Sequence, residues 1–483
     1  MRSSYAVNKT PHFSVLSEDQ KEDVHFASLE ILWRTGSRVF CEEAIDLLVG
    51  AGADVSDGNL VRIPAHLVEW AVRCAPPRVA VAGRDGGRSM FLEDGKTYYG
   101  TGSDCPNIVD SDTGERRKFV KDDVARGSLL CDALPNIDFM MSMGLASDVP
   151  EETSDRHQFE AMVLNTTKPI VFTAHDLDGL QDIVDMAAAV AGDLDELRRN
   201  PFIILYAEPI SPLKNAKEAV EKLLYMAENC LPFIYAPGML SGATGPVTLA
   251  GCLALANAES LCGLVIAQLR REGAPFIHGG GILPMDMRTS VAAYGAPELQ
   301  LAGAALADMA HYYRLPRFSG AGASDSKVLD QQAMIEGTMS TVMQALCGAN
   351  LVHDVGYLES GLTGSYEMVV AMDEVIGMVK RIMTGIEIND DTLALDVIDR
   401  VGPGGQFIDD EHTLRLFREG WFPRLLDRRN YESWAGDGKK TMGERLNERV
   451  REVLSGHVPD PLPSETVGRI KKVIQAAETR LGV

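Results

Sequence analysis

Positive charge is scarce in this 483-residue chain. It contains 46 Lys and Arg against 69 Asp and Glu, which gives a formal net charge of −23. Nucleic acids and anionic membrane surfaces are bound through clustered Lys and Arg, so we expect no nucleic-acid or membrane partner. With 45% hydrophobic and 24% charged residues, the composition is that of a globular protein long enough to bury a large core.

Closely spaced cysteine pairs are absent as well. The eight cysteines include no CxxC, so they fit neither a disulfide scaffold nor a zinc ribbon. The N-terminal stretch MRSSYAVNKTPHFSVLSEDQ has no apolar leader. The apolar run around residue 257 is broken by Asn257 and Glu259 before it reaches the roughly 18 residues that a membrane span needs. We therefore expect a cytoplasmic protein.

Common catalytic signatures are also missing. The chain has no GxxxxGKS/T, GxGxxG, HExxH or GxSxG. Phosphate-loop, dinucleotide, zincin and serine-hydrolase chemistry therefore lose their main sequence support.

What the chain does have is a regular alternation of short apolar stretches with helix-length stretches. The apolar stretches begin near residues 98, 136, 168, 201, 231, 274, 315 and 350. The intervals between them hold one crossover helix each, for example over 217–229, 249–271, 298–313 and 331–347. Strands that alternate with helices form a parallel sheet, and eight such units close a (β/α)₈ TIM barrel of the α/β class. An open doubly wound sheet is the alternative.

Three regions follow from this pattern. Residues 1–97 are predicted to form an N-terminal α+β extension, with three helices and short β pieces at 78–82 and 90–92. Residues 98–385 form the barrel, which ends with a helix over 366–384. Residues 386–483 are a polar, helical C-terminal region that we expect to cover the surface or to form oligomers.

Polar residues at the ends of the predicted strands are the candidate site, because barrel enzymes place their active sites there. Tyrosine is frequent among them, and aromatic faces attract quaternary ammonium cations. For any single tyrosine, a structural role that caps the barrel with its hydroxyl in solvent is the commoner alternative. The cation-cage candidates are Tyr98, Tyr99, Tyr206 and Tyr357. The strand ends also carry Asp104, Glu208 and Asp354.

Two histidines and one arginine complete the candidate set. His278 and His353 each end an apolar stretch, and Arg288 lies just beyond another and could meet an anionic substrate group. A buried structural histidine is the alternative for either imidazole. Asp354 follows His353 directly, but adjacent strand residues point to opposite faces, which weakens a His–Asp pair.

Several segments resemble the trimethylamine methyltransferase superfamily of amine:corrinoid methyltransferases. The likeness covers nearly the whole chain. Its most specific block is GANLVHDVGYLESGLTGSYEMVVAMDE at 348–374. Further matching stretches are VRIPAHLVEWAVRCAP (61–76), YYGTGSD (98–104), SGATGPVTLAGCLALANAE (241–259), MDMRTS (285–290), GASDSKVLDQQAMIEG (322–337) and EHTLRLFREGWFPRLLDRRNYESW (411–434).

The resemblance implies a (β/α)₈ barrel that transfers a methyl group from a methylated amine to the Co(I) of a separate corrinoid protein. Founding members carry pyrrolysine, whereas this chain has only standard residues. It resembles the branch without pyrrolysine, whose members demethylate quaternary amines, so glycine betaine or a related betaine is the expected substrate. His353 would be the catalytic residue that holds or orients the substrate carboxylate, with His278 and Arg288 as further contacts.

The corrinoid should come from a partner protein, because the cobalamin-ligand signature DxHxxG does not occur in the chain. We expect no bound metal and a homo-oligomer. One alternative is a zinc-dependent methylcorrinoid:thiol methyltransferase, although the His-x-Cys pair of such barrels is absent. The other is a non-catalytic barrel that binds or senses betaines, since an aromatic cage would look the same in a binder.

Overall fold

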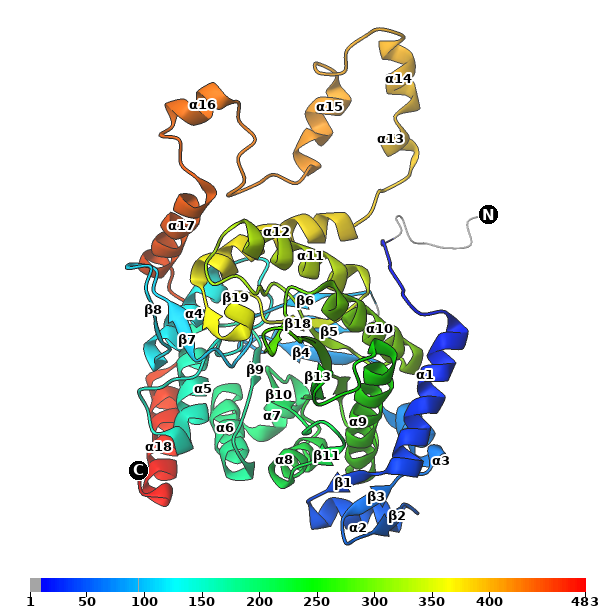
Figure 1. The fold of residues 1–483 in the computed structure, drawn as a ribbon. Helices are drawn as coiled ribbons and strands as arrows, with labels where there is room; N and C mark the ends of the chain where they lie inside the picture. Colours follow the sequence, from blue (N-terminus) through cyan, green and yellow to red (C-terminus); the bar gives the residue numbers. More distant parts are fainter. Residues whose placement is uncertain (1–9, 94) are drawn as a thin grey trace.

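Eight parallel strands close into a barrel in the computed structural model, which describes residues 10–93 and 95–483 (Figure 1). The strands are β6 (Tyr98–Tyr99), a short piece at 139–140, β9 (Ile170–Phe172), β10 (Ile203–Ala207), β12 (Phe233–Tyr235), β14 (Phe276–His278), β17 (Phe318–Gly320) and β18 (Leu351–His353). Parallel ladders join most neighbours, and β18 returns to β6. Single bridges complete the ring, pairing Gly100 with Phe139, Met140 with Ile170, and His278 with Arg317. The predicted TIM barrel is confirmed, and the open sheet is wrong.

One long helix follows each barrel strand. These helices are α4 (Lys121–Ala133), α5 (Ser154–Asn165), α6 (Leu177–Ala191), α8 (Lys217–Glu228), α9 (Leu249–Arg270), α10 (Pro297–Tyr313), α11 (Gln331–Leu346) and α12 (Tyr366–Met383). The bounds of the last five differ from the predicted ranges by at most one residue at either end. Periodicity located them well because each begins after a Gly- or Pro-containing loop and buries a continuous apolar face.

The barrel interior is a separate apolar core. Side chains that alternate along the strands point inward, among them Val171, Ile204, Ile234 and Ile277. The hairpin of β4 (Val79–Ala82) and β5 (Arg88–Leu92) packs against this core. The phenol oxygen of Tyr98 accepts a hydrogen bond from the Phe91 backbone N–H at 3.1 Å. The hairpin therefore fills the N-terminal end of the barrel, although the division at residue 97 assigns it to the extension; that division stays a prediction.

Residues before the hairpin form a small unit against α9. It contains α1 (Glu18–Glu30), a π-helical turn (Ile31–Thr35), β1 (Ser37–Val39), α2 (Glu42–Gly50), β2 (Asp54–Ser56), β3 (Leu60–Arg62) and α3 (Ala65–Cys74). Helices α1, α2 and α3 all contact α9. In the described part of the chain, α9 alone is long and apolar enough to cross a membrane, and 83% of its most apolar window is buried inside the protein. It is therefore a core helix. The first nine residues of the N-terminal stretch, which is expected to have no leader, lie outside the described residues.

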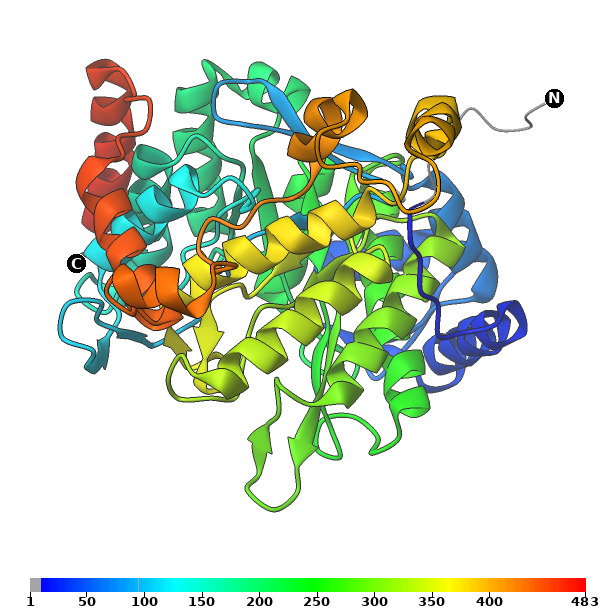
Figure 2. The ribbon, with the colours of Figure 1, turned by 90° about the horizontal axis from the view of Figure 1, so that it is seen from above.

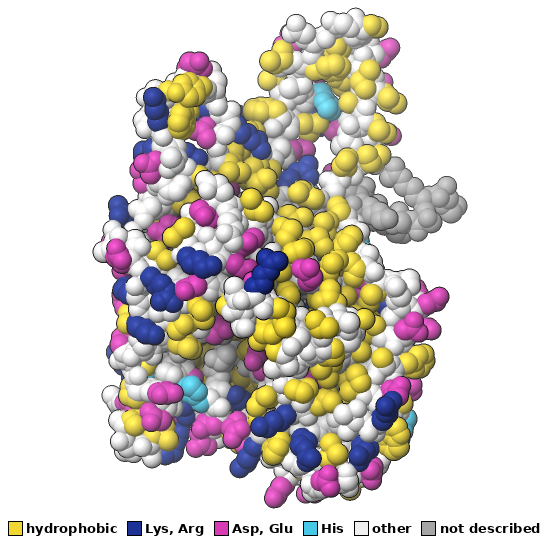
Figure 3. Space-filling model, viewed as in Figure 1, with side chains coloured by type: hydrophobic (Ala, Val, Ile, Leu, Met, Phe, Trp, Pro, Cys, Tyr) yellow, Lys and Arg dark blue, Asp and Glu magenta, His cyan; other side chains and the backbone are white. Residues whose placement is uncertain are grey.

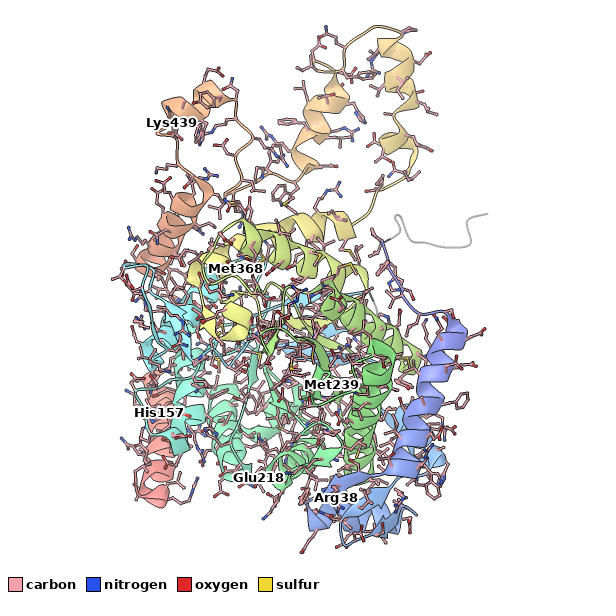
Figure 4. All side chains as sticks on the ribbon, viewed as in Figure 1. Arg38, His157, Glu218, Met239, Met368 and Lys439 are labelled. Atoms are coloured by element: carbon pink, nitrogen blue, oxygen red, sulfur yellow. The ribbon has the colours of Figure 1, made fainter. Side chains whose placement is uncertain are left out.

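Loops at the C-terminal ends of the strands, which we call the mouth, carry short sheets of their own. One joins β13 (Gly238–Ser241), β15 (Gly281–Asp286) and β16 (Val291–Ala292). The other joins β7 (Asn107–Val109), β8 (Arg116–Lys118), β19 (Tyr357–Leu358) and β20 (Thr363–Gly364). The β15–β16 hairpin stands out from the body in Figure 2, and Met239 on β13 is labelled in Figure 4. After β10, β11 (Lys214–Asn215) pairs with β1.

The C-terminal region divides into two parts. Helices α17 (Met442–Gly456) and α18 (Ser464–Leu481) pack on the barrel helices α12, α4, α5 and α6. At one such contact, the ring of His157 lies 3.1 Å from the Glu478 carboxylate (Figure 4). Residues 386–441, which we call the arm, stand away from the body over most of their length (Figure 1). The arm touches α12 where the backbone N–H groups of Arg424, Leu425 and Leu426 donate to the Glu374 carboxylate. The arm contains α13 (Asp390–Leu393), α14 (Leu395–Val401), α15 (Glu411–Leu416) and α16 (Tyr431–Gly436).

Candidate active site

A cavity of about 300 Å³ opens at the mouth of the barrel, over the ends of several strands. Its volume is at the lower end of the range for small-molecule sites. The residues that line it include three carboxylates, four aromatic or imidazole rings and no Lys or Arg. The rings belong to Tyr206, Tyr294, Phe318 and His353, and the carboxylates to Asp104, Glu208 and Asp354.

His353 and Asp354 face the same cavity although they are neighbours at the end of β18. The backbone of Asp354 has a φ of +72°, a left-handed conformation that a residue with a side chain seldom adopts. This turn brings its Oδ1 to 2.8 Å from the Nδ1 of His353. The imidazole also stacks on Phe318, with 4.2 Å between ring centroids. The ring of His353 is therefore fixed on two sides while 19% of its side chain stays exposed.

A second carboxylate, Asp104, is held by Tyr357. The Tyr357 hydroxyl donates to Asp104 Oδ1 at 2.7 Å and accepts from the Asp104 backbone N–H at 3.0 Å. Gly102 makes this arrangement possible, because a Cβ there would come within 2.2 Å of the Tyr357 oxygen and 2.5 Å of Asp354 Oδ1. Tyr357 is itself fully buried, so it orients Asp104 without lining the cavity.

The third carboxylate, Glu208, lies just beyond the end of β10 and accepts a hydrogen bond from the Tyr206 hydroxyl. The Tyr206 ring lies 5.3 Å from the ring of Phe318 and 6.1 Å from that of His353, centroid to centroid. Tyr206, Phe318 and His353 thus form one aromatic wall. Both Asp104 and Glu208 are set deep among other groups, yet each keeps an exposed surface that faces the cavity.

These surroundings change the acidity of the carboxyl groups. Burial raises the pKa of Asp104, and the nearby Asp354 charge raises it further. Burial also raises the pKa of Glu208, against the hydrogen bond from Tyr206, which lowers it. Negative charge collected in a poorly solvated cavity costs free energy unless a cation balances it. The cavity is therefore suited to a small cation with an apolar surface.

Comparisons with known proteins identify the family. The profile described as trimethylamine methyltransferase (MTTB) matches residues 1–482. The chain belongs to the trimethylamine methyltransferase family. It is 33% identical over 468 residues to the trimethylamine methyltransferase of Desulfitobacterium hafniense, covering 97% of this chain and 94% of the relative. It is 30% identical over 475 residues to the glycine betaine methyltransferase of the same species, covering 98% of each. The protein is thus a methyltransferase.

A solved structure agrees with the fold of this family member. The crystal structure of the Methanosarcina barkeri monomethylamine methyltransferase matches with a TM-score of 0.52 at 11% sequence identity, covering 98% of this chain and 88% of that one. At so low an identity, the likeness concerns the architecture of the barrel alone.

Five of the six predicted substrate contacts lie outside the cavity lining, namely Tyr98, Tyr99, Tyr357, His278 and Arg288, whereas Tyr206 and the predicted catalytic residue His353 line it. Tyr98 points to the plugged end of the barrel, and Tyr99 points outward, where its hydroxyl donates to the Thr341 carbonyl at 3.0 Å. His278 is fully buried on the outer face of β14, with its Nε2 3.2 Å from Asn257 Oδ1. Arg288 is exposed in the turn of the β15–β16 hairpin. Strand direction and side-chain parity turn Tyr98, Tyr99 and His278 away from the cavity, and Arg288 lies out in a hairpin turn. Which residues bind the substrate stays a prediction.

The cavity also contains groups to which sequence reasoning gave no role. Asp104, Glu208 and Asp354 stood among the strand-end residues without a function, and their convergence is visible only in three dimensions. Tyr294 was missed because it lies 16 residues beyond the end of β14. Asp325 fixes that loop by accepting backbone N–H groups of Tyr294 and Gly295 at 2.8 and 2.9 Å. Phe318 reads in the sequence as an ordinary apolar strand residue.

Within residues 10–93 and 95–483, one group of side chains is close enough to hold a metal ion: His12, Asp308 and His311. None of the three lines the cavity, and the group includes no cysteine. The carboxylate of Asp308 already accepts the backbone N–H groups of Val15 and Leu16 at 2.8 and 2.9 Å. The group thus ties the N-terminal segment to α10.

Proposed function

We propose that this methyltransferase moves a methyl group from a quaternary amine to the Co(I) of a corrinoid that a partner protein carries. The observation that carries the proposal is the cavity at the barrel mouth, where three carboxylates and an aromatic wall converge without a Lys or Arg. Quaternary ammonium groups donate no hydrogen bonds, so charge and aromatic faces are the means of binding them. The names of the two relatives, one acting on trimethylamine and one on glycine betaine, support a methylated amine as the donor.

The chemistry demands little from the protein beyond placement. The corrinoid supplies a nucleophilic Co(I) that takes the methyl group, and a quaternary nitrogen leaves as a neutral amine, so no general acid is required. Tyr206 and Phe318 would hold the cation on one side and Asp104 and Glu208 on the others. Placement of this kind contributes by fixing the N-methyl group toward the mouth and by excluding water.

His353 is the residue that we place against the substrate at the point of reaction. Its ring cannot turn freely, because it stacks on Phe318 and contacts the Asp354 carboxylate. A fixed ring limits the positions that the methyl groups can take. We assign it an orienting role, and Asp354 the role of holding it.

Docking of the corrinoid protein would use the loops around the mouth. Large hydrophobic side chains are exposed on six of these loops: Leu145, Ile210, Val247, Met287, Val328 and Leu362. Exposed hydrophobic groups around a concave site are typical of an interaction surface. Figure 3 shows hydrophobic side chains gathered on this face of the molecule, beside a hollow. All eight cysteines are free thiols, which supports a reducing, cytoplasmic location.

The test is an anaerobic absorbance experiment. Co(I) corrinoid on a candidate partner protein is mixed with the enzyme and, in separate cuvettes, with glycine betaine, choline, tetramethylammonium, trimethylamine or buffer. We expect the Co(I) spectrum to change to that of the methylated Co(III) form with a quaternary amine. Conversion with trimethylamine alone would overturn the quaternary-amine proposal. Binding without conversion would favour the non-catalytic binder, and stoichiometric zinc with methyl transfer to a thiol would favour the zinc-dependent alternative.

A further inference from the structure

The cavity carries an excess of negative charge that no neighbouring cation balances. Asp104, Glu208 and Asp354 line it, and its lining contains no Lys or Arg. His353 is the one basic side chain of the lining, and its Nδ1 already contacts Asp354 at 2.8 Å. A ligand that enters this cavity therefore meets more acidic than basic groups.

Basic side chains nearby are turned to other partners. Lys222 donates to the backbone carbonyls of Ala174 and His175. Arg317 is fully buried behind the strands, where its guanidinium donates to the carbonyl of His278 at 3.2 Å and to that of Gly280 at 2.6 Å.

The exposed basic groups of the mouth loops do not compensate either. Lys327 donates to the Asp325 carbonyl at 2.8 Å, and Arg288 lies in the exposed turn of the β15–β16 hairpin. Neither residue lines the cavity. No arginine or lysine of the described residues is thus placed to hold a substrate carboxylate inside it.

We propose that the donor is a quaternary ammonium compound of net positive charge without a carboxylate, and that Asp104 and Glu208 select it over zwitterionic betaines. The inference rests on the proposed function, which it narrows. A choline-like or tetraalkylammonium cation meets only attraction from the acidic groups and the aromatic wall. The carboxylate of a betaine in the same cavity would face like charges and would lose its hydration without gaining an ionic partner.

The decisive comparison is between choline and glycine betaine. Both have a trimethylammonium group, and they differ chiefly in ending with a CH₂OH or a carboxylate. Isothermal titration with each, without the corrinoid protein, measures the preference of the cavity directly. We expect choline and tetramethylammonium to bind at least tenfold more tightly than glycine betaine. Equal or tighter binding of glycine betaine, or no binding of any of the three compounds, would overturn the proposal.

Variants identify the groups responsible. Glu208→Gln and Asp104→Asn should each reduce the ratio of choline to glycine betaine affinity by severalfold, chiefly by weakening choline binding. Glu218→Gln makes the same chemical change on the exposed face of α8 (Figure 4) and should leave the ratio unchanged. Thermal melts of all three variants establish that they are folded. An unchanged ratio in folded Glu208→Gln and Asp104→Asn proteins would contradict the assignment.

The absorbance experiment separates this inference from the proposed function. If glycine betaine binds more tightly than choline and is demethylated, the charge-selection proposal fails while the methyltransfer proposal stands. If choline is preferred but no quaternary amine is demethylated, the proposed reaction fails while the measured selectivity remains.

Discussion

At the scale of single residues, the site depends on backbone conformations that bring neighbouring side chains together. Asp354 occupies a left-handed conformation with a φ of +72°. Such a conformation costs about 1–3 kcal/mol for a residue other than glycine, and strain of this kind gathers at functional sites. Gly102 and Gly320 leave the space that its carboxylate needs, because a Cβ on either glycine would come within 3 Å of that group.

Replacement of His353 by Ala should impair methyl transfer without unfolding the protein. The side chain lines the cavity and is partly exposed, so its loss leaves the barrel core intact. We expect kcat/KM to fall by about 10²-fold, the usual effect of misplacing a reacting group by about 1 Å. Asp354→Asn, which removes the charge beside the ring, should produce a smaller loss in the same direction. Steady-state kinetics with a corrinoid partner, paired with thermal melts, provides the measurement, and unchanged kinetics for His353→Ala would reject the assignment.

Two tyrosines provide a matched pair for phenylalanine substitution. Tyr206→Phe removes the hydrogen bond to Glu208 and should weaken binding of a quaternary cation severalfold. Tyr99→Phe removes the hydrogen bond to the Thr341 carbonyl outside the barrel. It should lower the free energy of unfolding by about 1 kcal/mol and leave affinity unchanged. If Tyr99→Phe weakened cation binding and Tyr206→Phe did not, the cation would bind on the outer side of β6 and the assignment of the site to the mouth cavity would be wrong.

Cation binding should depend on pH through Asp104 and Glu208. The pKa values of both carboxyl groups are raised above their ordinary values of 3.8 and 4.5, chiefly by burial. As the pH falls through these raised values, each group takes up a proton and loses its attraction for the ligand. The Kd for tetramethylammonium, whose charge does not change with pH, should therefore rise as the solution is acidified.

The contribution of Asp104 and Glu208 to the free energy of unfolding of the ligand-free protein should change with pH in the opposite direction, becoming more favourable in acid. A carboxyl group whose pKa is higher in the folded than in the unfolded state favours folding below its unfolded pKa, and that contribution is lost as the pH rises through the folded value. Glu208→Gln removes one such group. It should therefore weaken the pH dependence of the Kd for tetramethylammonium and also that of the free energy of unfolding. Asp354, His353, Tyr206 and Tyr357 also face these carboxylates, so the variant is the control that assigns the effect.

At the scale of elements, polar side chains are buried between the barrel strands and the helices that surround them, where partners on other elements contact them. His278 on β14 contacts Asn257 on α9, and its Nδ1 has no hydrogen-bond partner among the residues that the structure describes. Burial, together with the charge of Arg317, lowers the pKa of His278 from 6.5 to about 3. The histidine is therefore neutral in the folded protein at physiological pH.

A buried neutral histidine predicts loss of stability in acid. Because the folded pKa is lowered, His278 favours the folded state above the unfolded value near 6.5, and this contribution is lost as the pH falls toward about 3. Between pH 6.5 and pH 5 the loss from this one group is about 1.6 kcal/mol, because the slope rises from half of about 1.4 kcal/mol per pH unit at pH 6.5 to nearly that full value at pH 5. Urea unfolding of the protein and of His278→Asn at both pH values measures it. An equally steep decline in the variant would assign the acid sensitivity to other groups.

At the scale of the whole molecule, the arm at 386–441 is the part that its own chain leaves uncovered. None of its side chains is buried, and apart from its contact with α12 at residues 424–426 it stands away from the barrel helices in Figure 1. Exposed hydrophobic residues occur along its length: Ile386, Ile388, Leu393, Leu395, Ile398, Phe407, Ile408, Leu414, Phe417, Phe422 and Tyr431. Short helices of this kind gain most of their stability from packing, so the arm requires a covering surface.

We expect that surface to belong to a second copy of the chain. Hydrophobic side chains are also exposed on α11 and α12, namely Ile335, Met339, Met378 and Ile382. In a symmetric dimer the arm of each copy could pack on α11 and α12 of the other, which would cover both sets of hydrophobic residues. Light scattering after size exclusion should give a dimer or a larger assembly at micromolar concentration. A triple variant with Ile386, Leu395 and Ile408 changed to Ser should shift the population toward the monomer. Val458→Ser, which alters an exposed residue outside the arm, should not, and a monomeric wild type would contradict the prediction.

Much of the architecture could be predicted from local sequence because the local signals agreed with one another. Apolar stretches bounded by Gly or Pro located the strands, and 3.6-residue periodicity located α8 to α12 nearly to the residue. The segments that resemble the family extend along nearly the whole chain, so the amino-acid sequence also indicated the family and its methyltransferase activity.

The site could be predicted only in part, because it depends on side-chain parity and on contacts between distant loops. Tyr98 and Tyr99 are adjacent, and nothing local indicates which one faces the barrel interior. Asp104 and Tyr357 are 253 residues apart yet share two hydrogen bonds. The sequence by itself determined the order of strands and helices, since that order follows from periodicity. The tertiary structure alone decided that the cavity is acidic, because that property arises only when Asp104, Glu208 and Asp354 converge at the mouth of the closed barrel.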